Sequence, residues 1–203
     1  MCSAVFLPRA HGIFFFSTEL NYNPVGMTTL AYEQSAPRRF PISVEVYRLM
    51  AEKGAFAPDE RVELIDGEII EMSPIGPRHA RVVDFLNEFL TSLPKRDFIV
   101  RIQNSVVLDD FSQPQPDVTL VKRRDDFYRY ELPNNCDVVL AIEVADSTVV
   151  FDRSVKLPKY SDSGIPECWL VDLDAERVEV HSQPKEGTYG AVKIYKRDET
   201  VVS

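Results

Sequence analysis

The chain lacks the features that mark membrane-spanning and disulfide-stabilised proteins. Among its 203 residues, no apolar run approaches the roughly 18 residues that a membrane-spanning helix needs. Only three cysteines occur, an odd number whose spacing fits no zinc motif: Cys2, Cys136 and Cys168. We therefore expect reduced thiols in a cytoplasmic protein without a membrane segment.

Nucleotide-binding signatures and an excess of positive charge are also missing. Neither a glycine-rich dinucleotide fingerprint nor a P-loop occurs, which leaves a nucleotide-binding enzyme without support. The formal net charge is −9, whereas proteins that bind nucleic acid usually present a basic face. An acidic total remains compatible with DNA as a partner, because a local basic patch or a bridging divalent cation can contact the phosphates. It argues against tight nonspecific DNA binding.

The length and composition fit one globular domain with a loose N-terminal end. Hydrophobic residues make up 44% and charged residues 27% of the chain, as in folded proteins. A chain of this size buries a sizeable core without disulfides or metals. We expect residues 1–40 to form an N-terminal extension and residues 41–203 to form the folded domain.

Hydrophobic periodicity predicts a mixed sheet flanked by helices, an α/β architecture. One helix is expected from Ser43 to Gly54 and a second from Arg78 to Leu93. Between them, two alternating runs flank Asp66-Gly67, a preferred pair for a tight hairpin turn. The remaining predicted elements are strands at 98–108, 116–121, 138–144, 168–173, 177–181 and 191–195, a loop or short helix at 122–130, and a helix at 147–162 that Pro158 should kink.

Two carboxylates stand out in these predicted strands. Glu143 lies in the apolar run VVLAIEV, where an unpaired carboxylate is costly, so it should be paired, protonated or bound to metal. The alternative is a strand-end glutamate that faces solvent or pairs with a lysine. Asp117 opens another apolar strand, and taken alone it fits an ordinary turn aspartate. Together with Lys156 on the next helix, the two carboxylates could converge on a site for Mg²⁺, which prefers oxygen ligands.

Basic and aromatic residues interleave in the segment from Lys122 to Tyr130, which reads KRRDDFYRY. Such a segment can follow a phosphate backbone and stack on bases. The alternative is a solvated loop without a binding role.

A series of short motifs runs through residues 40–200 in a fixed order: VELIDGE from Val62, His79 at a helix start, Pro116-Asp117, Ile142-Glu143-Val144 with Ser147, Asp152-Arg153, Lys156 with Tyr160, GIPE from Gly164 and WLVD from Trp169. This combination resembles the Uma-type restriction endonuclease family of the PD-(D/E)xK nuclease superfamily. The resemblance implies a restriction-endonuclease-like core with a central mixed β-sheet flanked by helices.

The resemblance also implies the site residues. Asp117 resembles the first metal-binding aspartate, and Glu143 resembles the acidic residue of the second half-motif. The lysine expected two residues later is replaced by Ala145, and the family points instead to Lys156 on the following helix. The implied metal ligands are Asp117, Glu143, Glu63 and the backbone carbonyl of Val144, and the implied catalytic residues are Asp117, Glu143, Lys156, Glu63 and His79.

Two of these residues have simpler alternatives. Glu63 could be a hairpin residue that faces solvent. His79 is expected to contact the site or a phosphate, because a helix N-terminus favours anions, but it could be a surface or capping histidine.

The implied function is hydrolysis of DNA phosphodiester bonds with Mg²⁺ or Mn²⁺, by a protein that forms a homodimer by analogy. The alternative is a nuclease-like domain that binds DNA or protein without cutting. Ala145 and the acidic net charge favour that alternative, whereas the retained set of Asp117, Glu143 and Lys156 opposes it.

The N-terminus carries a prediction about the start of translation. The run Gly12–Phe16 is too short for a signal-peptide core, and an ordinary start, Met27, follows shortly after it. We expect translation to begin at Met27, so that residues 1–26 are absent from the native protein. Intact-mass spectrometry tests this, and a mass that includes Met1 or Cys2 would contradict it.

Overall fold

The computed structural model describes residues 39–93 and 97–201, which belong to one compact unit spanning Arg39–Ser203. Residues 1–38, including Met27, lie outside the described residues, as does Pro94, which directly follows the helix predicted to end at Leu93. No helix within the described ranges is long and apolar enough to cross a bilayer.

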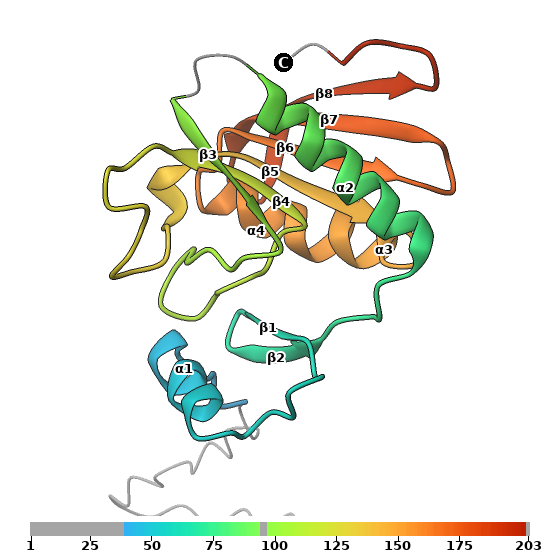
Figure 1. The fold of residues 1–203 in the computed structure, drawn as a ribbon. Helices are drawn as coiled ribbons and strands as arrows, with labels where there is room; N and C mark the ends of the chain where they lie inside the picture. Colours follow the sequence, from blue (N-terminus) through green and yellow to red (C-terminus); the bar gives the residue numbers. More distant parts are fainter. Residues whose placement is uncertain (1–38, 94–96, 202–203) are drawn as a thin grey trace, which may run out of the picture. The chain divides into compact units, whose positions relative to one another are not determined.

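A six-stranded sheet in the order β3-β4-β5-β6-β7-β8 forms the centre of the unit (Figure 1). Strands β5 and β6 are parallel and every other neighbouring pair is antiparallel, so the predicted mixed sheet is confirmed. The strands are β3 (Phe98–Ile102), β4 (Val118–Lys122), β5 (Val138–Ala145), β6 (Glu167–Asp172), β7 (Arg177–Lys185) and β8 (Thr188–Lys196).

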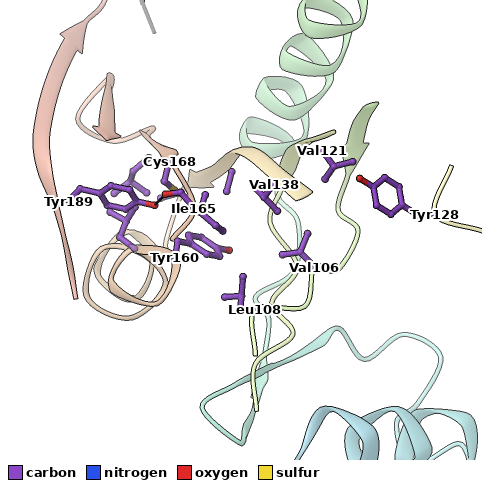
Figure 2. Packing of buried hydrophobic residues seen from close by; sticks show 13 residues of the cluster. Val106, Leu108, Val121, Tyr128, Val138, Tyr160, Ile165, Cys168 and Tyr189 are labelled. Atoms are coloured by element: carbon purple, nitrogen blue, oxygen red, sulfur yellow. Dashed lines mark hydrogen bonds between the residues drawn. The ribbon is translucent and has the colours of Figure 1, made fainter. Parts of the chain in front are cut away.

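Helices cover both faces of this sheet. Alternate residues of β5 point to opposite faces, and Leu140, Ile142 and Val144 pack in a cluster with α2 (Pro77–Ser92). Figure 1 shows α2 lying across this face. The odd-numbered Ala141 and Ala145 pack in a second cluster with Leu157 and Tyr160, drawn in Figure 2. The sheet therefore separates two apolar layers.

The helical connection between β5 and β6 is interrupted as expected near Pro158. It consists of α3 (Val149–Phe151), a π-helical turn (Asp152–Lys156) and α4 (Leu157–Asp162). Proline has no N–H to donate to the carbonyl four residues earlier, and its ring crowds that carbonyl, so a regular α-helix cannot continue through it. The wider turn places both Asp152 and Lys156 among the buried residues. π-turns of this kind often occur at functional sites.

The predicted first helix and hairpin are confirmed. Helix α1 (Val44–Glu52) begins after Ser43, whose hydroxyl accepts a hydrogen bond from the Val46 N–H. Strands β1 (Val62–Ile65) and β2 (Glu68–Glu71) pair antiparallel around Asp66-Gly67. Both turn residues have positive φ, 50° and 77°, as this tight turn requires. Leu64 in β1 also exchanges backbone hydrogen bonds with Gln113, which fixes the hairpin beside the loop that leads into β4.

Several predicted boundaries were wrong. The strand expected at 98–108 ends at Ile102, because Gln103 adopts a left-handed conformation with φ of 48° that breaks the ladder. Strands β7 and β8 extend beyond the predicted ranges, since they form one hairpin whose register continues to Lys185 and Thr188. Of the two alternatives for the segment at 122–130, the loop is confirmed, since Lys122 ends β4 and residues 123–130 form turns and irregular backbone.

The two-layer core predicts where truncation is costly. Leu170 in β6 is fully buried, so Leu170→Ala should lower the free energy of unfolding by about 3 kcal/mol through lost burial and a residual cavity. Val139 in β5 is 39% exposed, and Val139→Ala should cost less than about 1 kcal/mol. Urea unfolding of both variants tests this, and equal losses would contradict the described core.

Candidate active site

Asp117 lies directly before β4 and is held by donors from three parts of the chain. Its Oδ2 accepts the Val144 backbone N–H at 2.9 Å and lies 3.0 Å from His79 Nε2. Its Oδ1 accepts a hydrogen bond from the Gln103 side chain at 3.3 Å. Burial by itself would raise the pKa of Asp117, but the hydrogen bond and charge of His79, with the Val144 N–H and Gln103, lower it overall. The carboxyl is therefore fixed and favoured as an anion.

Glu143 lies on β5, the neighbour of β4, and is 2% exposed. Its Oε1 lies 2.9 Å from Lys156 Nζ and accepts a hydrogen bond from the Tyr160 hydroxyl at 2.5 Å. The alternative of a solvent-facing strand end is therefore wrong, whereas the alternative of a pairing with a lysine is confirmed. Since both contacts engage Oε1, Oε2 is the oxygen that they leave unengaged.

The position of Lys156 shows how the chain accommodates Ala145. Residues 143 and 145 point to the same face of β5, and a lysine at 145 would share that face with Glu143. Here the π-turn packs on this face and supplies the ammonium of Lys156 instead. Lys156 is fully buried behind Glu143 and does not line the cavity described below, so its catalytic role stays a prediction.

Glu63 on β1 provides the second carboxylate that pairs with the ammonium of Lys156. Its Oε2 lies 3.3 Å from Lys156 Nζ and accepts the Gln115 backbone N–H at 3.0 Å. The residue is fully buried, so the alternative of a solvent-facing hairpin residue is wrong. Its Oε1 is a buried atom without a hydrogen-bond partner. Glu63 reaches the cluster through Lys156 and does not line the cavity, so its role as a metal ligand stays a prediction.

His79 lies in the first turn of α2, as the sequence indicated, and contacts Asp117. Its side chain is 13% exposed, which contradicts the surface alternative. Nδ1 is buried without a hydrogen-bond partner. Because His79 lines the cavity and orients Asp117 at the same time, it can act on the site through that carboxylate.

Sequence reasoning missed the position of Asp152. The adjacent Arg153 points elsewhere and binds Asp172 on β6 and Glu179 on β7. Asp152 is 4% exposed, accepts a hydrogen bond from the Thr148 hydroxyl at 2.6 Å and lines the cavity. Consecutive residues of a regular helix point about 100° apart, which gave a weak signal that the two would separate.

The cluster around Lys156 contains more carboxylates than cations. Burial raises the pKa of Glu143 to about 8, with Lys156 opposing and Asp152 adding to this rise. Burial also raises the pKa of Asp152. Burial alone would lower the pKa of Lys156, but Glu143 and Glu63 raise it, so the ammonium stays charged. The excess negative charge must be balanced by a proton or by a bound cation.

A cavity of about 120 Å³ opens beside this cluster. Its lining carries four carboxylates, Asp117, Glu143, Asp146 and Asp152, together with His79, and it includes the β2–α2 connection (residues 72–76). No group of three or more His, Cys, Asp or Glu side chains in residues 39–93 and 97–201 is already gathered as a metal site. The donors nevertheless fit Mg²⁺, which takes one or two carboxylates and keeps several waters.

Comparisons with known proteins support a nuclease-like identity. A family model, Uma2, described as "Putative restriction endonuclease", matches residues 44–203. The crystal structure of "a putative nuclease belonging to DUF820 from Anabaena variabilis ATCC 29413" is similar with a TM-score of 0.60 and 16% identity, over 80% of this chain and 89% of that chain. At this identity the likeness shows a common fold. No curated protein matches the chain.

The raised pKa of Glu143 predicts a pH-dependent stability. Its pKa lies near 4.5 in the unfolded chain and near 8 in the folded protein, so folding retains a proton. This contribution is complete below pH 4.5 and is lost as pH rises through 8, by up to about 1.4 kcal/mol per pH unit. As the pH rises from about 5 to 8, the free energy of unfolding of the wild type should fall relative to that of Glu143→Gln, whose side chain has no carboxyl proton to lose. Urea unfolding in the absence of metal measures this difference. Parallel pH profiles would contradict the prediction.

Proposed function

Since the chain belongs to the Uma2 family of restriction-endonuclease-like proteins, we propose that it is an endonuclease that hydrolyses DNA phosphodiester bonds with Mg²⁺ or Mn²⁺. The observation that carries this proposal is the cavity where Asp117 and Glu143 meet, backed by a buried ammonium. A pure binding module gains nothing from a cluster whose burial costs several kcal/mol per ion.

In this proposal, Asp117, Glu143 and the carbonyl of Val144 hold the ion. A bound Mg²⁺ supplies a water of lowered pKa and stabilises charge on the phosphate. The donors around Asp117 fix the direction of its carboxylate before any ion binds, which limits the reorganisation that binding requires. Glu63, with one unpartnered oxygen, adds negative charge behind the site.

Lys156 acts through Glu143 in this arrangement. Its ammonium engages Oε1 of Glu143, which favours presentation of the other oxygen toward the cavity. The family role, orienting water or neutralising the transition state, would require the ammonium to move past Glu143. A fixed positive charge beside the site also favours negative charge developing on the phosphate, without direct contact.

His79 is proposed to stabilise the metal-binding form of Asp117 through its Nε2 contact. Mutation of such partners of ligating carboxylates commonly lowers metal affinity or activity about 10–100-fold.

Cleavage of both DNA strands would require two such sites, so the proposal includes a homodimer. Nicked rather than linear product from supercoiled DNA would indicate that single copies act alone.

The proposal predicts a pattern of cleavage defects on supercoiled and single-stranded DNA with Mg²⁺ or Mn²⁺. Asp117→Asn keeps the side-chain size but removes a charged ligand, and it should lower the cleavage rate at least about 100-fold. Lys156→Met keeps much of the buried volume while removing the ammonium, and it should lower the rate by a similar order. Gel quantification of nicked and linear product measures both rates.

Asp146→Asn is the matched control, because Asp146 lines the same cavity but pairs with the exposed Arg78. It should retain cleavage near the wild-type rate. Circular dichroism checks that every variant is folded. If the folded wild type cuts none of these substrates with either metal, the endonuclease proposal fails and the binding-module alternative replaces it.

A further inference from the structure

A loop at the opposite end of β4 and β5 from the site presents aromatic rings stacked with arginines. Asp117 precedes β4 and Glu143 lies near the end of β5, whereas this loop follows β4 and leads towards β5. We call residues 122–131 the arginine–aromatic loop. Three guanidinium groups lie over rings within it: Arg123 over Phe127 at 5.7 Å, Arg124 over Tyr128 at 4.7 Å, and Arg129 over Tyr130 at 5.4 Å.

Tyr128 anchors the loop to the core. Its ring is 7% exposed and belongs to the same cluster as Val121, as Figure 2 shows. Its hydroxyl donates a hydrogen bond to the Lys122 carbonyl at 2.7 Å, and Arg101 lies over the ring at 5.9 Å. Arg124 is likewise tied down, by Asp126 and Glu131. These contacts make the base of the loop a fixed platform.

The other two rings point outward from this platform. Phe127 is 60% exposed and Tyr130 is 81% exposed. Phe127 and Tyr128 are consecutive residues with positive φ, 51° and 58°, a conformation that costs bulky L-residues on the order of 1–3 kcal/mol each. Stability is therefore given up to hold a large apolar ring in water at position 127, where glycine or asparagine would lower both costs.

The charge of the loop favours stacking over simple electrostatic attraction. It contains four basic and three acidic residues, within a chain of net charge −9. Its net charge is too small to attract a duplex strongly through phosphates alone. Rings paired with guanidinium planes suit unstacked bases, because every base has a π-face and arginine adds cation–π attraction and phosphate contacts. In a duplex the base faces are already stacked and unavailable.

We propose that the arginine–aromatic loop is a binding site for single-stranded nucleic acid, in which Phe127 and Tyr130 stack on bases and Arg129 contacts the phosphate backbone. Strand β4, at about 3.3 Å per residue, places this loop roughly 17 Å or more from Asp117. Binding here requires neither a metal ion nor cleavage, so the site can be tested independently of the proposed endonuclease activity.

The test measures fluorescence anisotropy of a fluorescein-labelled oligothymidylate, with an oligouridylate as a second arm, in EDTA. The full-length wild type should bind the single strand more tightly than a duplex of equal length. Phe127→Ala and Tyr130→Ala should each weaken binding about tenfold, while Phe127→Trp should retain it. Arg129→Gln should reduce the slope of log K against log salt by about 0.7.

Phe85→Ala in α2 is the matched control, since Phe85 is 65% exposed and stacks on Phe89 rather than under a guanidinium. It should bind like the wild type. Phe127→Leu separates stacking from general apolar contact, and it should bind as weakly as Phe127→Ala. Wild-type affinity of Phe127→Leu would instead indicate general apolar contact rather than base stacking, and it would overturn the proposal.

Absence of single-strand binding by the folded wild type, or wild-type affinity of Phe127→Ala and Tyr130→Ala, would also overturn it. Preference for oligothymidylate or oligouridylate would assign the ligand as DNA or RNA. Because the binding measurements exclude metal, single-strand binding without any cleavage in Mg²⁺ would contradict only the endonuclease proposal. Cleavage by the wild type together with unaltered single-strand binding by the loop variants would contradict only the proposed role of the arginine–aromatic loop.

Discussion

The buried ammonium of Lys156 is the interaction on which the rest of the site depends. It joins three segments far apart in the sequence: the first hairpin through Glu63, the central strand through Glu143, and the π-turn that carries the lysine itself. Removing one partner of such a group is strongly destabilising, because it leaves an unpaired charge in the interior. The three segments are therefore held in one arrangement by charge as well as by apolar packing.

The same interaction explains why the cluster is suited to a cation. Lys156 offers one positive charge to Glu63, Glu143 and Asp152. Burial raises the pKa of Glu143, and the neighbouring carboxylates add to this rise. A proton balances the charge in the absence of metal, and a divalent ion in the cavity would replace it. In the proposed function, stability and metal binding would be linked through one carboxyl group, because a ligand must lose its proton to bind.

The two ends of the central strands have different chemistry. One end carries the recessed carboxylates and His79 around a small cavity, and the other carries exposed rings under arginines. A rigid sheet connects them, so a strand bound at one end would have a defined distance to the other. This arrangement would let an acidic protein engage a polyanion without a broad basic surface.

The sequence by itself determined the elements whose signals are local. Ser43 and Gly54 delimited the first helix, Asp66-Gly67 determined the hairpin, and Pro158 predicted the interruption that became the π-turn, because caps, turn pairs and proline act within a few residues. The motif order, with Glu143 in an apolar strand, also indicated the mixed sheet and the pair of carboxylates that meet where β4 begins and β5 ends.

Only the tertiary structure decided the contacts that cross the fold. The burial of Glu63, the separation of Asp152 from Arg153, and the position of Lys156 behind Glu143 depend on how the hairpin and π-turn pack against the sheet. The early end of β3 likewise follows from the left-handed turn at Gln103. Periodicity reports which face of an element is apolar, but it does not report which distant side chain will occupy the space opposite a buried charge.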